Sequence, residues 1–216
     1  MVELKNVNVH YSSGVDALQN INLRINDGEF VFIVGGSGAG KSTLVKLMTR
    51  EIVPTEGRVF VNGYNLSKTK GNKIAKFRRS IGMVFQEPEH QFAANFVRDE
   101  VAIGPKSMGQ SQDEAYRTAD RMLEQMNLTR FAKANPYTLS GGEKRRLSVA
   151  SMLAAAPKVL VMDEPTFGQD FSTWNEMVKL IAAIRDQGSC VVMVTHDEAL
   201  VDALGARRVM FEEAKA

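Results

Sequence analysis

The chain is poor in cysteine and contains no long apolar run. Among 216 residues the one cysteine, Cys190, lies inside the apolar run 190–194, where a buried thiol is expected rather than a reactive one. A lone cysteine cannot form an internal disulfide, so a reducing, cytoplasmic setting is predicted. No segment approaches the roughly 20 apolar residues of a membrane span, and residues 1–5 lack the apolar core of a signal peptide. Any membrane role is therefore expected to depend on a partner subunit or on a surface contact.

An excess of charge of either sign is also missing. The 27 Lys and Arg residues face 25 Asp and Glu residues, which gives a formal net charge of +2. This balance provides no general attraction to nucleic acid or anionic lipid, so no nucleic-acid partner is expected. The three histidines, His10, His90 and His196, are far apart in the sequence, and they do not form the spacing of a zinc site.

The apolar residues predict strands that alternate with helices. Residues 4–9 and 21–25 carry apolar residues spaced through polar ones, which is typical of strands with one buried face. The fully apolar runs, typical of strands covered on both faces of a parallel sheet, are 30–34, 159–162 and 190–194, and an edge strand is predicted at 207–211. Helices are expected to begin at Gly40, near Ser111, at Gly142 and near Ser172. The fold class is therefore predicted to be α/β.

The middle of the sequence differs in character from its two ends. Pro88, Gly104, Pro105 and Gly109 come ahead of a charged helical run. We interpret residues 87–135 as a helical subdomain inserted between residues 1–86 and 136–216, which together form the catalytic core of a single domain, 1–216.

A glycine-rich loop follows the first fully apolar run directly. Residues 35–42 read Gly35-Gly36-Ser37-Gly38-Ala39-Gly40-Lys41-Ser42 and match the pattern G-x-x-x-x-G-K-[ST], with Thr43 opening an apolar helical stretch. Backbone N–H groups of such a loop point at phosphate oxygens, while Lys41 reaches the β and γ phosphates and Ser42 binds magnesium. The alternative, a glycine turn that a lysine follows by chance, fits the flanking strand and helix less well.

Two carboxylates and a histidine each follow a fully apolar run. Asp163 and Glu164 come after 159–162, and His196 comes after 190–195. Parallel sheets bind ligands at the carboxyl ends of their strands, so Asp163 is expected to hold magnesium and Glu164 to orient or deprotonate the attacking water. His196 is expected to contact the γ phosphate at the same edge. The alternatives are a solvated turn for the acidic pair and a helix cap for the histidine.

A second candidate phosphate site lies later in the chain. The run Leu139-Ser140-Gly141-Gly142-Glu143 precedes a helical stretch, and its serine and glycine amides can bind an anion at the helix start. Its alternative interpretation is an ordinary glycine-containing helix start. Together with the phosphate loop and Asp163-Glu164, this run resembles the signature motif of the ABC ATPase family.

The resemblance covers nearly the whole chain and implies a fold, an activity and a dimer. The implied fold is the P-loop NTPase fold of ABC ATPases, with an N-terminal antiparallel β subdomain, a parallel-sheet core and an inserted helical subdomain. MgATP hydrolysis is implied in two composite sites of a head-to-tail dimer, where the signature of one subunit closes over ATP held by the other. Tyr11 matches the family's adenine-stacking aromatic, Gln86 its Q-loop glutamine, His196 its switch histidine and Asp170 its D-loop aspartate.

The residue roles then follow from motif and resemblance together. The expected nucleotide contacts are Tyr11, Gly35, Gly36, Ser37, Gly38, Ala39, Gly40, Lys41, Ser42, Thr43, Ser140, Gly141, Gly142 and Asp170. The expected catalytic residues are Glu164, His196 and Gln86, and the expected magnesium ligands are Ser42, Gln86 and Asp163.

Different segments resemble different branches of the family. Residues 31–56 and 77–86 are similar to cell-division and lipoprotein-export ATPases, whereas 87–92, 97–102 and 166–170 are similar to energy-coupling-factor uptake ATPases. In the family the segment after the Q-loop receives a membrane permease, so a permease bound at 87–108 is expected to hold the chain on the cytoplasmic face of the membrane. An importer is the first expectation, and an exporter or a cell-envelope regulator the second. The residues also leave open a soluble ABC protein without a permease and a non-catalytic nucleotide-binding regulator.

Overall fold

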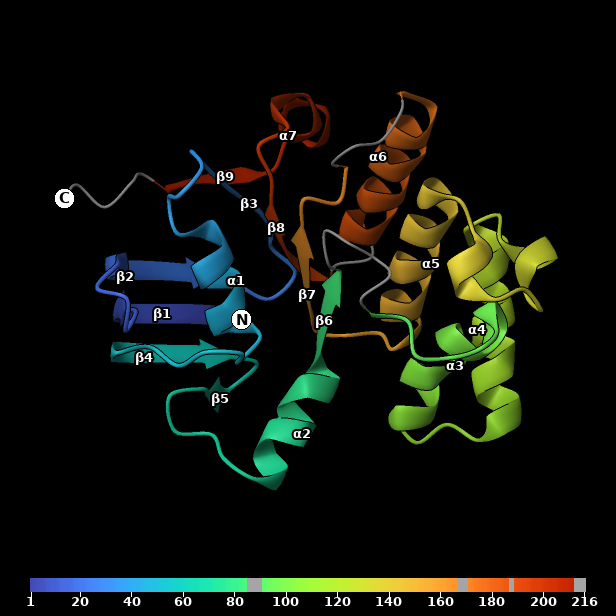
Figure 1. Cartoon of the computed structure of the whole chain (residues 1–216), viewed down its shortest axis with the longest axis horizontal. Coiled ribbons are helices and arrows are strands. Elements are labelled where there is room, and N and C mark those ends of the chain that lie inside the picture. The colour runs from blue at the N-terminus through green and yellow to red at the C-terminus, as the bar shows by residue number, and fades with distance from the viewer. Residues whose placement is uncertain (85–90, 167–170, 187–188, 212–216) are drawn as a thin grey trace.

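Two sheets of different type form the centre of the computed structural model, which describes residues 1–84, 91–166, 171–186 and 189–211 (Figure 1). The antiparallel sheet contains, in spatial order, β2 (Asp16–Ile25), β1 (Val2–His10), β4 (Glu56–Val61) and β5 (Tyr64–Asn65). The other sheet, in which all neighbouring strands are parallel, contains β6 (Ile81–Val84), β7 (Val159–Asp163), β8 (Cys190–Val194), β3 (Phe30–Gly35) and β9 (Arg207–Phe211). The α/β class and the edge position of 207–211 are confirmed.

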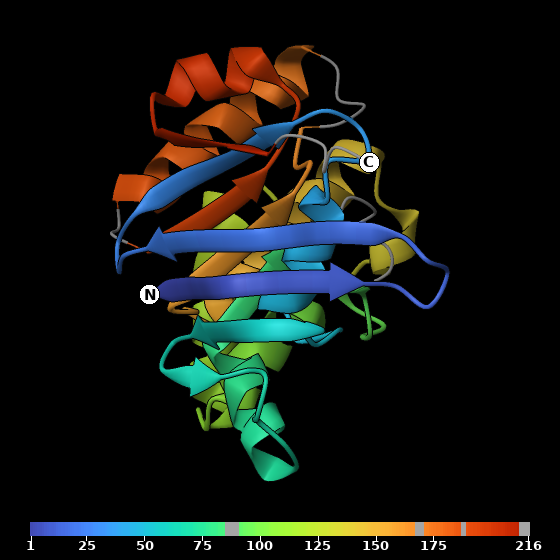
Figure 2. The ribbon, with the colours of Figure 1, turned by 90° about the vertical axis from the view of Figure 1, so that its left-hand side faces the viewer.

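Both faces of the parallel sheet are covered, which explains its continuously apolar strands. Along β3, Phe32 packs into one hydrophobic cluster, while its neighbours Val31 and Ile33 pack into a second cluster on the opposite face. The second cluster also contains α1 (Lys41–Met48) and the antiparallel strands, whereas the first contains α5 (Gly141–Ala154). In Figure 2 the antiparallel sheet lies in front of the parallel strands. The helices α1 and α5 therefore cover opposite faces of the parallel sheet.

The antiparallel strands contain bulges that alter the spacing of their apolar residues. Asn6 and Asn20 have φ of 48° and 47°, and the pairing of β1 with β2 shifts register between Leu4 and Val7. Asparagine tolerates this left-handed backbone better than most residues do. Each bulge is held by a side chain of the neighbouring strand, because Asn6 N–H donates to Asn22 Oδ1 at 3.0 Å and Asn20 N–H to Asn8 Oδ1 at 2.6 Å. The predicted N-terminal strands are confirmed, with this irregularity added.

A group of helices lies on the side of the parallel sheet away from the antiparallel sheet (Figure 1). After α2 (Asn72–Ser80) and β6, the described chain forms α3 (Val97–Ser107), α4 (Gln112–Gln125) and the short 3₁₀ helices η2 (Thr129–Phe131) and η3 (Pro136–Thr138). Glu100 of α3 is buried and accepts the N–H groups of Ala93 and Ala94 at 2.8 and 2.7 Å, so the chain ahead of α3 is fixed to it. The limits 87–135 of a helical subdomain stay a prediction.

The remaining helices are α6 (Phe171–Asp186) and α7 (Glu198–Leu204). The predicted helix starts agree with the structure to within a residue: Gly40 and Ser111 are the N-caps of α1 and α4, and α5 and α6 each begin one residue earlier than predicted. Within the described ranges, no helix combines the length and the apolarity that crossing a membrane requires.

The cysteine lies inside the parallel sheet. Cys190, the first residue of β8, is 1% exposed, and burial raises the pKa of its thiol to about 11. The thiol is therefore protonated at neutral pH and unreactive, and the prediction of a buried thiol is confirmed.

Candidate functional site

A cleft of about 720 Å³ lies at the carboxyl ends of three parallel strands, β3, β7 and β8. Its lining comes from segments far apart in the sequence: Tyr11, residues 15–17, residues 35–43, Asp163, Glu164, Val194 and His196. This is the edge where α/β sheets bind ligands. The glycine loop, the acidic pair and the histidine that the sequence singled out thus line one cleft.

The glycine loop joins β3 to α1 through backbone conformations that favour glycine. Gly38 and Gly40 have φ of 83° and 88°, in a region that L side chains rarely adopt. A Cβ atom on Gly40 would lie 2.5 Å from the carbonyl oxygen of Ala17, so the position has no room for a side chain. Gly40 is also the N-cap of α1 and has no side chain to accept the first N–H groups. Those N–H groups, at the positive end of a helix, are suited to an anion.

Lys41 is held inside this loop. Its Nζ donates to the carbonyl oxygens of Gly35 and Gly36 at 2.6 and 2.7 Å, so the loop curls around the ammonium group. On the far side of the helix start, the Tyr11 hydroxyl lies 3.2 Å from Oγ1 of the buried Thr43. Tyr11 is thereby positioned at the mouth of the cleft.

The two carboxylates at the end of β7 have different surroundings. Burial raises the pKa of Asp163, the neighbouring charge of Glu164 raises it further, and Lys41 opposes both. Glu164 has a left-handed backbone with φ of 47°, and its N–H donates to the carbonyl oxygen of Val194 at 2.9 Å. Strained backbone of this kind is common where a side chain must point into a site.

The Glu164 carboxylate is held from β8. The Thr195 hydroxyl donates to its Oε2 at 3.1 Å, and His196 Nδ1 lies 2.6 Å from its Oε1. The cap of the following helix is Asp197, whose side chain accepts the N–H of Leu200, so the alternative of His196 as a helix cap is wrong. Thr195 was not predicted as a site residue, although it lies between the end of β8 and His196.

The signature run forms the start of α5. The Ser140 side chain accepts the N–H of Glu143, and Glu143 Oε2 accepts the N–H and the hydroxyl of Ser140 at 2.9 and 2.8 Å. The Ser140 backbone N–H, against a smaller opposing effect of burial, holds the pKa of Glu143 below its usual range. Ser140 and Gly141 are exposed. Of the described residues, those that line the cleft do not include Ser140, Gly141 or Gly142.

The chain matches a known protein family. The family model described as ABC transporter matches residues 18–167. The chain belongs to the ABC transporter family. Its nucleotide-binding core is that of an ATP-hydrolysing cassette, and the resemblance indicated by the motifs is confirmed.

Similar proteins carry transporter names. A putative ABC transporter ATP-binding protein of Pyrococcus furiosus is 42% identical over 201 residues, which is 93% of this chain and 76% of that protein. The energy-coupling factor transporter ATP-binding protein EcfA1 of Clostridium novyi is 37% identical over 215 residues, 97% of this chain and 75% of that protein. A putative ABC transporter ATP-binding protein of Caldanaerobacter subterraneus is 35% identical over 215 residues, and there the chain spans 37% of the relative's length.

A solved ABC cassette has the same architecture. The dimeric post-hydrolysis structure of the ATP-binding cassette MJ0796 bound to ADP and Pi has a TM-score of 0.88 and 32% identity, over 100% of this chain and 97% of that one. The predicted fold class is confirmed in full, including the antiparallel sheet beside the parallel one.

Two residues that the family resemblance singled out, Gln86 and Asp170, lie outside the described residues.

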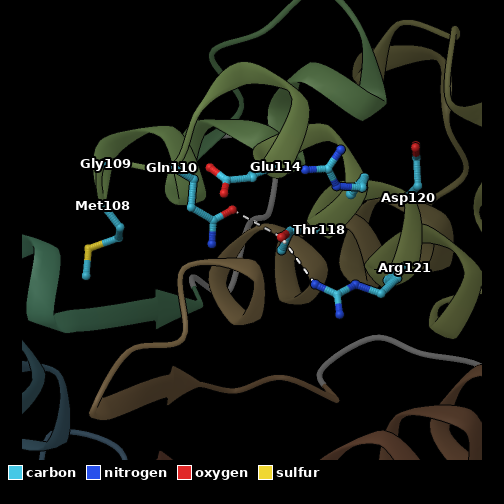
Figure 3. Close-up of a pocket in the computed structure, with 8 residues that line it drawn as sticks. Met108, Gly109, Gln110, Glu114, Thr118, Asp120 and Arg121 are labelled. Carbon is cyan, nitrogen blue, oxygen red and sulfur yellow. Dashed lines mark hydrogen bonds between the residues drawn. The ribbon is translucent and has the colours of Figure 1, made fainter.

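This ABC cassette has a second hollow, of about 730 Å³, where α3 turns into α4 (Figure 3). Most of its lining residues have polar side chains, and the Thr118 hydroxyl there donates to Gln110 and accepts from Arg121. None of the residues predicted to bind nucleotide lines this hollow. We therefore assign the nucleotide to the cleft at the strand ends.

Proposed function

We propose that this ABC ATPase hydrolyses MgATP as a head-to-tail dimer and thereby drives a separate integral-membrane permease. The observation that carries the proposal is the separation of its two helix starts. The start of α1 opens into the cleft, whereas the start of α5 belongs to a helix on the opposite face of the sheet. A second copy of the chain is then the natural source of the signature contacts to the γ phosphate.

The phosphate loop binds the triphosphate. The uncapped N–H groups at the start of α1 bind the phosphates, and Tyr11, which lines the cleft, stacks on the adenine ring. The ammonium group of Lys41 has three N–H donors, two of which the loop carbonyls accept, so one remains for a phosphate oxygen.

The residues present fit a magnesium ion that arrives with ATP. The Ser42 hydroxyl and the Asp163 carboxylate line the same cleft, and hard oxygen donors of this kind suit Mg²⁺. Gln86 completes the proposed set. The ion offsets negative charge on the phosphates, and it also relieves the repulsion between Asp163 and Glu164.

Glu164 is the proposed group that orients or deprotonates the attacking water. Its carboxylate lines the cleft and is fixed by Thr195 and His196, so it presents a defined lone pair rather than a mobile one. His196 is exposed beside it and can turn from Glu164 to the γ phosphate when ATP is bound.

The dimer is completed by the partner's α5 start and D-loop. Ser140, Gly141 and Gly142 offer hydroxyl and amide donors, and Asp170 is the D-loop residue that the family resemblance assigns to the interface. The similar cassette MJ0796 is dimeric in its structure with ADP and Pi. ATP then acts as the link between the two copies, and hydrolysis removes it.

The permease is proposed to bind at the helical side of the molecule. Phe96, Ile103 and Met108 are large apolar side chains of α3 and its ends, with 51%, 43% and 51% of their surfaces exposed. Met108 also lines the hollow of Figure 3. An apolar strip beside a hollow suits a short helix of a membrane subunit. The resemblance of residues 87–92 and 97–102 to uptake ATPases, and the similarity to EcfA1, favour an importer on the cytoplasmic face of the membrane.

The test is the substitution Glu164→Gln, which removes the proposed base and keeps the shape of the side chain. We expect MgATP affinity within about threefold of the wild type and a loss of turnover of about 10²–10⁴-fold. We also expect a stable dimer with MgATP in size-exclusion chromatography. The matched control is Glu114→Gln, an exposed glutamate of α4 far from the cleft, which should hydrolyse normally. Turnover at the wild-type rate by Glu164→Gln would refute the proposed role of the base.

A further inference from the structure

Asp197 accepts hydrogen bonds from three separate parts of the chain. Its Oδ2 accepts the indole N–H of Trp174 at 2.6 Å and the hydroxyl of Thr166 at 2.9 Å. Its Oδ1 accepts the N–H of Leu200 at 3.0 Å as the cap of α7. One carboxylate thus joins the segment after β7, the helix α6 and the start of α7.

The backbone of the same residue reaches Glu164. The N–H of Asp197 donates to the Thr195 hydroxyl at 3.0 Å. Since a hydroxyl has a single proton and this N–H occupies a lone pair of the oxygen, the proton is directed at Oε2 of Glu164, 3.1 Å away. Thr195 is completely buried, so its hydroxyl has little choice of partner. The orientation of Glu164 therefore depends on the position of Asp197.

The charge of Asp197 is needed for this arrangement. Burial opposes ionisation, but the hydrogen bonds from Trp174, Leu200 and Thr166 outweigh it and lower the pKa of the carboxyl. The ionised form accepts on both oxygens at neutral pH. Thr166 is itself only 6% exposed, so its hydroxyl is shielded from competing water.

We infer that Asp197 is a positioning residue that couples the orientation of Glu164 to Thr166 and to Trp174 of α6. The inference rests on the proposed function, in which Glu164 orients or deprotonates the attacking water. Because Thr166 and Trp174 both donate to one oxygen of Asp197, a displacement of either residue on dimer formation moves Asp197. The water-activating carboxylate is thereby aligned when the partner is in place.

The chain contains a natural fluorescent reporter of the hydrogen bonds that Asp197 accepts. Trp174 is the single tryptophan in the sequence. Besides its N–H contact with Asp197, its ring is stacked on that of Phe171, with centroids 6.4 Å apart and an angle of 5° between the planes. Phe171 directly follows Asp170 and is 79% exposed. A change at Phe171 or at Asp197 should therefore alter the emission of Trp174.

The kinetic test uses Thr166→Val and Trp174→Phe, which each remove one donor to Oδ2 and keep the cap of α7. We expect kcat to fall about tenfold in each, with an unchanged KM for MgATP, because the alignment of Glu164 is lost and nucleotide binding is not. The double variant should lose less than the product of the two single effects, since both donors act on one oxygen. The matched control, Thr118→Val, removes the hydroxyl of Figure 3 on α4 and should leave kcat at the wild-type value.

The spectroscopic test separates this inference from the proposed function. In Glu164→Gln protein, MgATP should shift the emission of Trp174, and adding Thr166→Val should reduce that shift while calorimetry shows the same ATP affinity. A wild-type kcat in both donor variants, or an undiminished emission shift with Thr166→Val, would overturn the role of Asp197. Absence of magnesium-dependent hydrolysis by the wild-type chain would overturn the proposed function instead, and the emission measurement needs no turnover.

Discussion

The starts of α1 and α5 are both glycine-rich, yet they satisfy their backbone groups in opposite ways. At α1 the N-cap is Gly40, which has no side chain, and the first N–H groups open into the cleft. At α5 the cap is Ser140, which forms a reciprocal capping box with Glu143. An anion completes the first helix start. At the second it must compete with a carboxylate that is already in place, so a phosphate is expected there only when the rest of a partner subunit holds it close.

A third helix start shows which part of the signature run matters. The start of α4 has the same reciprocal capping box between Ser111 and Glu114. The spacing of serine and glutamate is therefore a structural feature that recurs away from the cleft. What distinguishes α5 is the pair Gly141-Gly142 after the serine, which leaves the amides exposed to an approaching ligand.

The largest expected effect comes from adding a methyl group at each glycine-rich start. Gly40→Ala places a side chain at φ of 88°, with its Cβ 2.5 Å from Ala17 O and 2.7 Å from Leu18 Cδ2. The backbone conformation alone costs about 1–3 kcal/mol, so we expect a marked fall in Tm and loss of ATP binding. Gly141→Ala meets no atom within 4 Å of the new Cβ. Its Tm and its monomeric ATP affinity should be unchanged, while MgATP-driven dimer formation is lost.

Scanning calorimetry, ATP titration and size-exclusion chromatography of the two variants check this difference. Wild-type dimerisation by Gly141→Ala would contradict the role given to the α5 start. Tight ATP binding by Gly40→Ala would contradict the role given to the α1 start.

A smaller effect is expected from the two capping serines, which form a matched pair. Ser140→Ala and Ser111→Ala each remove a capping side chain, which costs about 1 kcal/mol, and each should lower the Tm by about 2–4 °C. Only Ser140→Ala should also lower the turnover, by about tenfold, because only its hydroxyl has a γ phosphate to bind in the dimer. Steady-state phosphate release at saturating MgATP measures the difference. Equal turnover in the two variants would show that the Ser140 hydroxyl is a cap and nothing more.

The sequence was sufficient wherever the deciding interactions are local. The run 30–34 followed by the glycine loop predicted β3, the loop and α1, because strand burial and the turn preferences of glycine act within a few residues. The helix start near Ser111 was likewise predicted, and the capping box that forms it joins residues only three positions apart. The cleft could also be anticipated, since parallel strands end at one edge.

The interactions that join distant segments were not predicted. The network of Thr166, Trp174 and Asp197 spans 31 residues, and no periodic pattern specifies which donors meet one carboxylate. The bulges at Asn6 and Asn20 depend in the same way on side chains of the neighbouring strand. For Gln86 and Asp170, outside the described residues, the assignment stays a prediction from the resemblance.

The smallest effect is expected on the Tm, from substitutions of the two carboxylates that lie near the two helix starts. Asp163, which faces the α1 start, has a pKa raised by burial and by Glu164, whereas Glu143 at the α5 start has a pKa lowered chiefly by the Ser140 N–H. The folded chain binds the Asp163 proton more tightly than the unfolded chain does, so above the folded pKa the ionised group destabilises the fold. For Glu143 the sign is opposite, and its stabilisation is present above the unfolded value and lost as the pH falls through the folded pKa.

Without nucleotide and magnesium, Asp163→Asn should therefore raise the Tm at pH 7 by about 2–4 °C. In a chain of this size, a change of about 1 kcal/mol in the free energy of unfolding shifts the Tm by that amount. Glu143→Gln should lower it. Both differences in Tm from the wild type should shrink as the pH falls. The difference for Asp163→Asn should shrink as the pH falls through the raised pKa of Asp163. The difference for Glu143→Gln should shrink at lower pH, as the pH falls through the lowered pKa of Glu143. Thermal melts of the three proteins from pH 7 downward measure the two curves. If Asp163→Asn is less stable than the wild type at pH 7, burial and the neighbouring charge of Glu164 do not destabilise the ionised Asp163 in the folded chain.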